Sequence, residues 1–110
     1  MIKIRVTRNK QKNIVSFSVK GHANADEYGK DIVCASISIL AQTAVLALHE
    51  VGYIDVIYEM EDGLLNCKIP DDIDSTQRER ANIILDTMLI GMNGTANMYP
   101  DYIKLQDEEV

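Results

Sequence analysis

Two short stretches near the start of the chain alternate strictly between apolar and polar residues. Every second residue is apolar in Ile2–Thr7 and again in Val15–Val19, and the polar segment Asn9–Asn13 separates them. A period of two is typical of a strand that places one face in the core. The pattern therefore predicts an antiparallel hairpin whose turn is Asn9–Asn13.

Two longer segments have helical character. Asp31–Glu50 is rich in helix formers, apolar on nearly every side, and followed by Gly52, a candidate for the residue after the helix end. Further on, Thr76 and Glu79 have the spacing of a capping box, and apolar residues then recur at helical intervals towards Gly94. The sequence predicts one widely buried helix and one amphipathic helix.

Three further segments complete the predicted sheet. Ile54–Glu59 alternates, and the turn residues Glu61–Gly63 lead into the apolar stretch Leu64–Ile69. Tyr99–Leu105 has the aromatic and β-branched content of a last strand. The order ββαββαβ predicts a single α+β domain over the whole 110-residue chain, with two helices in one layer and a mixed, mainly antiparallel sheet in the other.

Apolarity and charge indicate the partners. An all-round apolar helix in a two-layer domain leaves apolar surface uncovered, which predicts a homodimer. The net charge of −6 disfavours non-specific contact with nucleic acid, so we expect no direct nucleic-acid partner. The same charge keeps the protein soluble and would also attract a basic partner.

The start of the chain and its cysteines indicate the compartment. The chain opens on a strand pattern, and polar residues interrupt its longest apolar segment, so we expect neither export nor a membrane span. The two cysteines, Cys34 and Cys67, lie in different predicted elements, which gives no sign of a disulfide. These features predict a cytoplasmic protein.

Cys34 and His22 are the candidates for nucleophilic chemistry. Cys34 falls in the first turn of the predicted helix, where the helix dipole favours a thiolate by at most about 2 kcal/mol, so a base is also needed. His22 lies at a strand-to-loop junction and suits that role, whereas His49 would be roughly 22 Å along the helix from Cys34. The residues alone leave open a packed core thiol and a solvent-exposed loop histidine.

Asp31 has two possible roles that conflict. As the N-cap of the helix its carboxylate would oppose formation of the Cys34 thiolate, whereas turned towards His22 it would orient the imidazole. Cys67, on an apolar strand, is interpreted as a core thiol. The two cysteines and two histidines have no metal-binding spacing, and no nucleotide-binding glycine motif occurs, so neither a metal nor a cofactor is predicted.

The stretch Gly21-His22-Ala23, followed by Gly29 and by Asp31-Ile32-Val33-Cys34-Ala35, resembles the ribosomal-processing cysteine protease family called Prp. The first hairpin, the apolar helix and the segment Tyr99–Tyr102 are similar to the family as well, so the resemblance covers essentially the whole chain. Ser36-Ile37 departs from the small residues expected there, which affects packing more than the motif.

The resemblance implies a dimeric cysteine endopeptidase that removes the N-terminal extension of the ribosomal protein L-twenty-seven precursor. It implies Cys34 as nucleophile, His22 as base and Asp31 as a third catalytic residue, with N–H groups at the helix start as the oxyanion hole. Gly21, Ala23, Tyr28 and Gly29 are then expected at the substrate. They lie in a loop, residues 21–30, that would order over the peptide with Gly29 as a hinge.

Two other functions fit parts of the sequence. In a non-enzymatic ribosome-associated binding module, Cys34 would be a core residue and the apolar helix would only mediate dimerisation. A thiol-based redox sensor would need a nearby resolving cysteine, and Cys67 lies in a separate element. The reactivity of Cys34 towards alkylating agents distinguishes the protease from the binding module.

Overall fold

The computed structural model describes residues 1–22 and 27–110, and the side chains of residues 27–31 lie outside that description. The described residues form five strands and two helices, in the predicted order ββαββαβ, and the predicted α+β fold is confirmed. The elements are β1 Ile2–Arg8, β2 Ile14–Lys20, α1 Glu27–Glu50, β3 Ile57–Glu61, β4 Leu64–Lys68, α2 Ser75–Met98 and β5 Ile103–Glu109.

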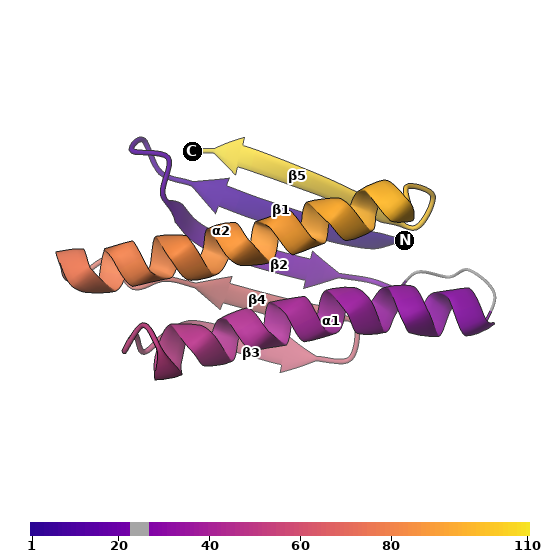
Figure 1. The fold of residues 1–110 in the computed structure, drawn as a ribbon, viewed down its shortest axis with the longest axis horizontal. Coiled ribbons are helices and arrows are strands. Elements are labelled where there is room, and N and C mark those ends of the chain that lie inside the picture. Colours follow the sequence, from indigo (N-terminus) through magenta and orange to yellow (C-terminus); the bar gives the residue numbers. More distant parts are fainter. Residues whose placement is uncertain (23–26) are drawn as a thin grey trace.

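The sheet is mixed and mainly antiparallel, with the strand order β3-β4-β2-β1-β5. Antiparallel pairs join β1 to β2, β2 to β4 and β3 to β4, whereas β5 runs parallel to β1 at the opposite edge from β3. Both helices cover the same face of the sheet and lie side by side, running in opposite directions (Figure 1). Among the residues that the structure describes, none forms a helix on the other face of the sheet (Figure 1).

The core lies between the helix layer and the sheet. Alternate residues of β1, such as Ile4 and Val6, are buried against helix residues that include Ile37 and Leu85. The two helices approach closely at Gly91, where a Cβ would lie 3.0 Å from a methyl group of Leu40. The predicted wide burial of the first helix is therefore met by the sheet and by α2 together.

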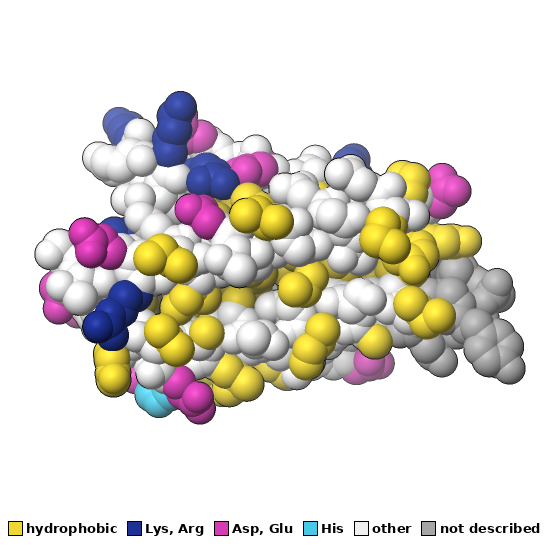
Figure 2. All heavy atoms as spheres, in the orientation of Figure 1, with side chains coloured by type: hydrophobic (Ala, Val, Ile, Leu, Met, Phe, Trp, Pro, Cys, Tyr) yellow, Lys and Arg dark blue, Asp and Glu magenta, His cyan; other side chains and the backbone are white. Residues whose placement is uncertain are grey.

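The outer face of the helix layer is nevertheless apolar. On α1 the side chains of Ile32, Ile39 and Leu46 are spaced seven residues apart, and each is more than half exposed. Ile83 and Ile90 are exposed with the same spacing on α2. Hydrophobic side chains gather over both helices on this face (Figure 2). We name these five residues the outer apolar stripe.

Within the described residues, Ile32–Glu50 has the length and composition of a helix that could cross a membrane, with a mean hydropathy of 1.9. The core helix of a soluble protein meets the same two criteria. One third of this stretch is buried inside the domain. The exposed remainder includes Ile32, Ile39 and Leu46 of the outer apolar stripe.

The first helix begins earlier than the sequence predicts, at Glu27 in place of Asp31. Residues 27–30 of the expected loop are helical, and Asp31 is an interior helix position, so the N-cap, one of the two roles considered for Asp31, is wrong. At the other end the left-handed residue is Tyr53, with φ 55°, and not the expected Gly52. Gly52 is needed for space, because a Cβ there would lie 2.6 Å from the carbonyl oxygen of Leu48.

The second helix has a capping box two residues before the predicted one. The side chain of Asp74 accepts a hydrogen bond from the backbone N–H of Gln77, whose side chain accepts one from the N–H of Asp74. The predicted pair Thr76 and Glu79 is therefore inside the helix. The helix also continues past Gly94 to Met98, since a single glycine weakens a helix without ending it.

Two strands are shifted towards the C-terminus relative to the prediction. Ile54 is buried but precedes β3. Its N–H donates a hydrogen bond to Leu48 O at the end of α1, so this N–H is not available to a neighbouring strand. The segment Tyr99–Tyr102 forms a turn, closed by a hydrogen bond from Tyr102 N–H to Tyr99 O. The last strand therefore starts at Ile103 and continues to Glu109, beyond its predicted end at Leu105.

Candidate active site

A cavity of about 290 Å³ lies between α1, the end of β2 and the turn that joins β3 to β4, and both His22 and Cys34 line it. Apolar residues of the sheet and of α1 form part of the lining, together with a few polar ones. The apolar members include Ile2, Val19, Ile37 and Leu65, and the polar ones include Ser38, Gln42, Glu61 and Asp62. The two predicted catalytic residues thus share one open site.

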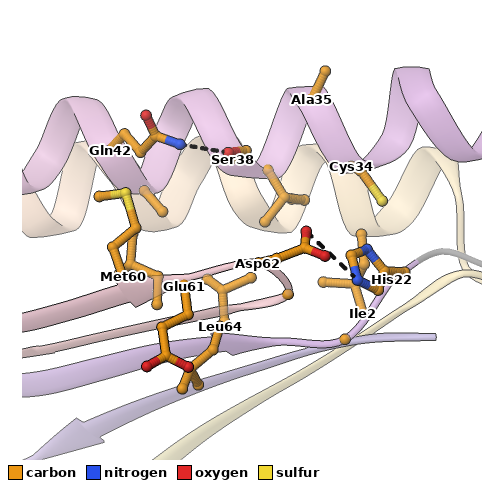
Figure 3. A pocket seen from close by; sticks show the side chains of 16 residues that line it. Ile2, His22, Cys34, Ala35, Ser38, Gln42, Met60, Glu61, Asp62 and Leu64 are labelled. Atoms are coloured by element: carbon orange, nitrogen blue, oxygen red, sulfur yellow. Dashed lines mark hydrogen bonds and ion pairs between the residues drawn. The ribbon is translucent and has the colours of Figure 1, made fainter.

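Cys34 enters the cavity from the helix layer. Its side chain is partly exposed, and its sulfur points from α1 towards the His22 ring (Figure 3). It lies seven residues beyond Glu27, about two helical turns from the start of α1. The helix dipole acts on groups in the first turn, so the predicted dipole activation of Cys34 and the predicted oxyanion hole of helix-start N–H groups do not fit this position.

His22 enters the cavity from the end of β2. The preceding residue, Gly21, has a φ of 88°, and a Cβ there would lie 2.5 Å from the carbonyl oxygen of Met1. This close approach requires a glycine at this position; Gly21 also lines the cavity, and its predicted role at the substrate stays a prediction. The His22 side chain is 41% exposed, so its ring is accessible from the cavity and from solvent.

The turn between β3 and β4 forms the wall beside His22. Gly21 N–H donates a hydrogen bond of 2.8 Å to Gly63 O, and Asp62 Oδ1 lies 3.9 Å from His22 Nε2. The dashed line between Asp62 and His22 in Figure 3 marks this contact, which is an ion pair when the ring is protonated. Sequence analysis identifies this segment as a turn but gives it no part in the site.

Ser38 and Gln42 are further polar residues that sequence analysis missed. They follow Cys34 at intervals of four along α1, which places all three on one side of the helix, facing the cavity. Gln42 Nε2 donates a hydrogen bond of 2.7 Å to Ser38 Oγ. The spacing of four from Cys34 is the signal that would have identified them.

The remaining predicted site residues are only partly described. Ala23 and the side chains of Tyr28 and Asp31 lie outside the described residues, so the substrate roles of Ala23 and Tyr28 and the catalytic role of Asp31 stay predictions. Gly29 lies within α1, which does not fit its predicted role as a loop hinge.

Cys67 is separate from the site. It is 2% exposed on β4, and burial raises the pKa of its thiol to about 12, so it stays protonated near neutral pH. It is a core thiol, as predicted. Among the described residues, no group of three or more His, Cys, Asp or Glu side chains is arranged to hold a metal ion.

Comparison with known proteins identifies the class of enzyme. The family described as Cysteine protease Prp matches residues 1–104, so this chain is a cysteine protease. The ribosomal processing cysteine protease Prp of Bacillus subtilis is 26% identical over 107 residues, and that of Staphylococcus aureus is 30% identical over 109 residues. Both alignments cover 96% of this chain, and they cover 96% of the B. subtilis protein and 97% of the S. aureus protein. The chain belongs to the Prp family.

Solved structures agree with this assignment. A Streptococcus mutans protein superposes with a TM-score of 0.87 at 27% identity, over 100% of this chain and 96% of the other. The essential ribosomal processing protease Prp from S. aureus, in complex with a covalently linked product peptide, superposes with a TM-score of 0.85 at 28% identity, over 97% and 99%. A second complex of the S. aureus protease, with a substrate peptide, has a TM-score of 0.84.

Proposed function

We propose that this protease removes the N-terminal extension of the ribosomal protein L-twenty-seven precursor, with Cys34 as nucleophile and His22 as general base. The observation that carries the proposal is that both side chains line one open cavity at the end of the sheet. The ribosomal-processing names of the relatives, and the S. aureus complexes with peptides, support a peptide substrate of this kind.

The proposed reaction proceeds through an acyl-enzyme. His22 takes the proton of the Cys34 thiol, and the thiolate sulfur attacks the scissile carbonyl carbon. The imidazolium then gives its proton to the leaving amine as the peptide C–N bond breaks, which leaves a thioester on Cys34. His22 next takes a proton from water, whose oxygen attacks the thioester and releases the carboxylate product and the thiol.

Incubation with an extended L-twenty-seven precursor, followed by intact-mass analysis, tests the proposal. The wild-type protein should convert the precursor to two products, whereas Cys34→Ala and His22→Ala should leave it intact. Cys67→Ala is the matched control and should retain cleavage, because its thiol is buried away from the cavity. Cleavage by Cys34→Ala would contradict the mechanism. Binding of the peptide without cleavage by the wild-type protein would favour the binding module.

The protein is further proposed to act in the cytoplasm as a homodimer. The outer apolar stripe, with Ile39 63% and Leu46 61% exposed, supports a second copy of the chain as its cover. Replacing both residues with lysine should shift the sedimentation mass at micromolar concentration from dimer to monomer. Gln106→Lys is the control, because it adds the same type of charge on the opposite face of the sheet and should leave the mass unchanged. A wild-type mass equal to the monomer would contradict the dimer.

A further inference from the structure

The turn between β3 and β4 fixes the backbone that carries His22. The register of β2 with β4 pairs Lys20 with Leu64, so the turn lies beside the residues that follow Lys20. The hydrogen bond of 2.8 Å from Gly21 N–H to Gly63 O extends this pairing by one step beyond β2. The backbone just before His22 is therefore held by the same turn that contributes to the wall of the cavity.

The His22 ring also packs against this turn. Gly63 has a φ of 72°, and a Cβ built on it would lie 2.8 Å from His22 Nε2 and 3.4 Å from Cε1. Such a short separation means that any side chain at this position would displace the imidazole. The ring occupies the space that glycine leaves open.

The neighbouring carboxylate is aimed at the same nitrogen. Asp62 Oδ1 lies 3.9 Å from His22 Nε2, while the Cys34 sulfur approaches the ring from α1 (Figure 3). This distance exceeds that of a hydrogen bond, so the carboxylate acts on the ring only through its electric field. The contact becomes an ion pair when the ring is protonated, which is the state that forms when Cys34 loses its proton.

We propose that Asp62 is a positioning residue for His22 in this protease, an inference that rests on the proposed function. Its carboxylate favours the tautomer of the neutral ring in which Nε2 carries the proton. Nδ1 is then left to accept the proton of the Cys34 thiol. The same charge favours the thiolate–imidazolium pair over the neutral pair. Because Cys34 lies beyond the first turn of α1, this pairing takes the place of the dipole activation expected from the sequence.

The exposure of Asp62 determines how large its effect on the thiolate–imidazolium pair is and how that effect depends on salt. Its side chain is 97% exposed, so water and salt weaken the attraction. Exposed ion pairs of this kind change equilibria by roughly two- to fivefold. The contribution of Asp62 should therefore be of that size at low ionic strength and should become small at about 1 M salt, where the screening length of about 3 Å is shorter than the separation.

Asp62→Asn tests the charge while keeping the shape of the side chain. At about 20 mM salt, where screening is weak, it should lower kcat for the extended precursor by roughly two- to fivefold with KM unchanged, and most of the difference should be lost at about 1 M salt. Asp62→Glu should retain most of the wild-type rate at low salt, because it restores the carboxylate.

Asp55→Asn is the matched control. Asp55 is 99% exposed and lies 3.6 Å from Nδ1 of the other histidine, His49, at the far end of α1. Asp55→Asn removes one negative charge from a histidine–aspartate pair that lies away from the cavity, so it should leave kcat unchanged. A rate for Asp62→Asn equal to wild type at low salt, or a loss that persists at high salt, would overturn the proposal.

A second measurement separates this proposal from the proposed substrate. The rate at which iodoacetamide alkylates Cys34 reports the thiolate and needs no peptide. Asp62→Asn should slow it at low salt by the same factor as kcat, and Asp55→Asn should not. If the wild-type protein left the precursor intact while Asp62→Asn still slowed alkylation, the substrate would be wrong and the positioning role would stand. If the wild-type protein cleaved the precursor and Asp62→Asn left the alkylation rate unchanged, the positioning role of Asp62 would be rejected and the proposed function would stand.

Discussion

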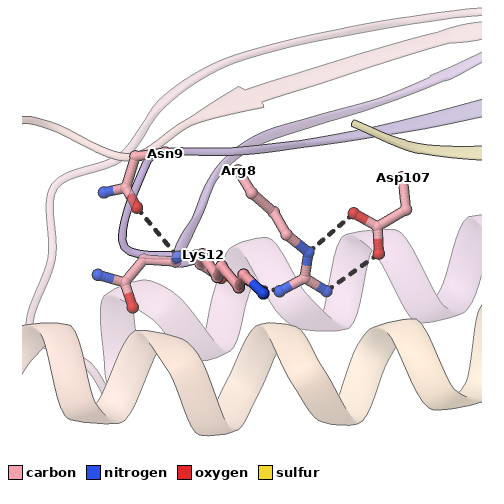
Figure 4. A network of polar contacts seen from close by, with 5 residues as sticks. Arg8, Asn9, Lys12 and Asp107 are labelled. Carbon is pink, nitrogen blue, oxygen red and sulfur yellow. Dashed lines mark hydrogen bonds and ion pairs between the residues drawn. The ribbon is translucent and has the colours of Figure 1, made fainter. Parts of the chain in front are cut away.

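Arg8 and Asp107 are joined by two hydrogen bonds, although ninety-nine residues separate them in the chain. Arg8 Nε donates to Asp107 Oδ1 at 2.8 Å and Nη2 donates to Oδ2 at 3.1 Å, while Nη1 donates to Lys12 O (Figure 4). One guanidinium thus links β5 to β1 and to the turn that follows β1. The hydrogen bond to Asp107 raises the pKa of the Arg8 guanidinium above its ordinary value, so the guanidinium stays charged.

Asp107→Asn should destabilise the domain by about 1 kcal/mol, because a two-pronged ion pair on partly covered side chains is worth more than a single exposed pair. Urea unfolding followed by circular dichroism measures the change. Glu108→Gln is the control: Glu108 contacts Arg5 at 3.5 Å with both side chains about half exposed, and its loss should cost almost nothing. Equal effects of the two substitutions would contradict this account.

The second half of the last strand could not be predicted from a local sequence pattern. Hairpins such as β1–β2 could be predicted because alternation and a local turn specify them. The residues Asp107–Glu109 are all acidic and lie beyond the predicted end of the last strand at Leu105, yet they pair in register with Val6, Thr7 and Arg8. Only the distant partner strand, with its arginines, makes this stretch a strand, and a local pattern does not contain that partner.

Gly63→Ala should impair catalysis more than it impairs folding. The new methyl group would lie 2.8 Å from His22 Nε2, so the ring must move away from its place beside Asp62 and Cys34. We expect kcat to fall by at least about tenfold, since catalytic groups must be held to within about 0.5 Å. The strained φ of 72° adds a stability cost of about 1 kcal/mol. Single-turnover cleavage and thermal unfolding measure the two effects.

Gly94→Ala is the matched control for that substitution. A Cβ at Gly94 meets nothing within 4 Å, and the residue lies inside α2. Its replacement should leave kcat unchanged and raise the stability by about 0.5 to 1 kcal/mol through helix propensity. A catalytic loss of equal size in both variants would show that the effect of Gly63→Ala is not specific to the site.

The site was predicted in part for the same physical reason as the fold. His22 and Cys34 could be identified from residue type, spacing and family resemblance. Asp62 and Gly63 could not, because they reach His22 only through the pairing of β2 with β4, which brings together residues about forty positions apart in the chain. The start of α1 was placed too late because the motif of small and polar residues before Asp31 reads as a loop.

Three lysines face one another across the uncovered side of the sheet, which leads to a prediction about stability. Lys3 of β1 is paired with Lys20 of β2 and with Lys104 of β5. Like charges directly opposite on a sheet repel, so Lys3→Gln should stabilise the domain by roughly 0.2 to 1 kcal/mol at low salt. The gain should shrink as salt screens the repulsion. Lys10→Gln, in the turn after β1, is the control and should have little effect in urea unfolding.

The buried thiol of Cys67 predicts how stability depends on alkaline pH. Burial raises its pKa from 9.0 to about 12, so above about pH 9 the unfolded chain loses this proton while the folded protein keeps it. The unfolded state is then favoured, and this group lowers the free energy of unfolding by about 1.4 kcal/mol for each pH unit between those two values, with no effect below them. Cys67→Ala removes this thiol but keeps every other titrating group. The difference in unfolding free energy between wild type and Cys67→Ala, measured in urea with a reductant from about pH 8 to about pH 10.5, should therefore be flat at first and then move steadily in favour of the variant. A constant difference over the whole range would mean that the thiol ionises as readily in the folded protein as in the unfolded chain, which its burial on β4 opposes.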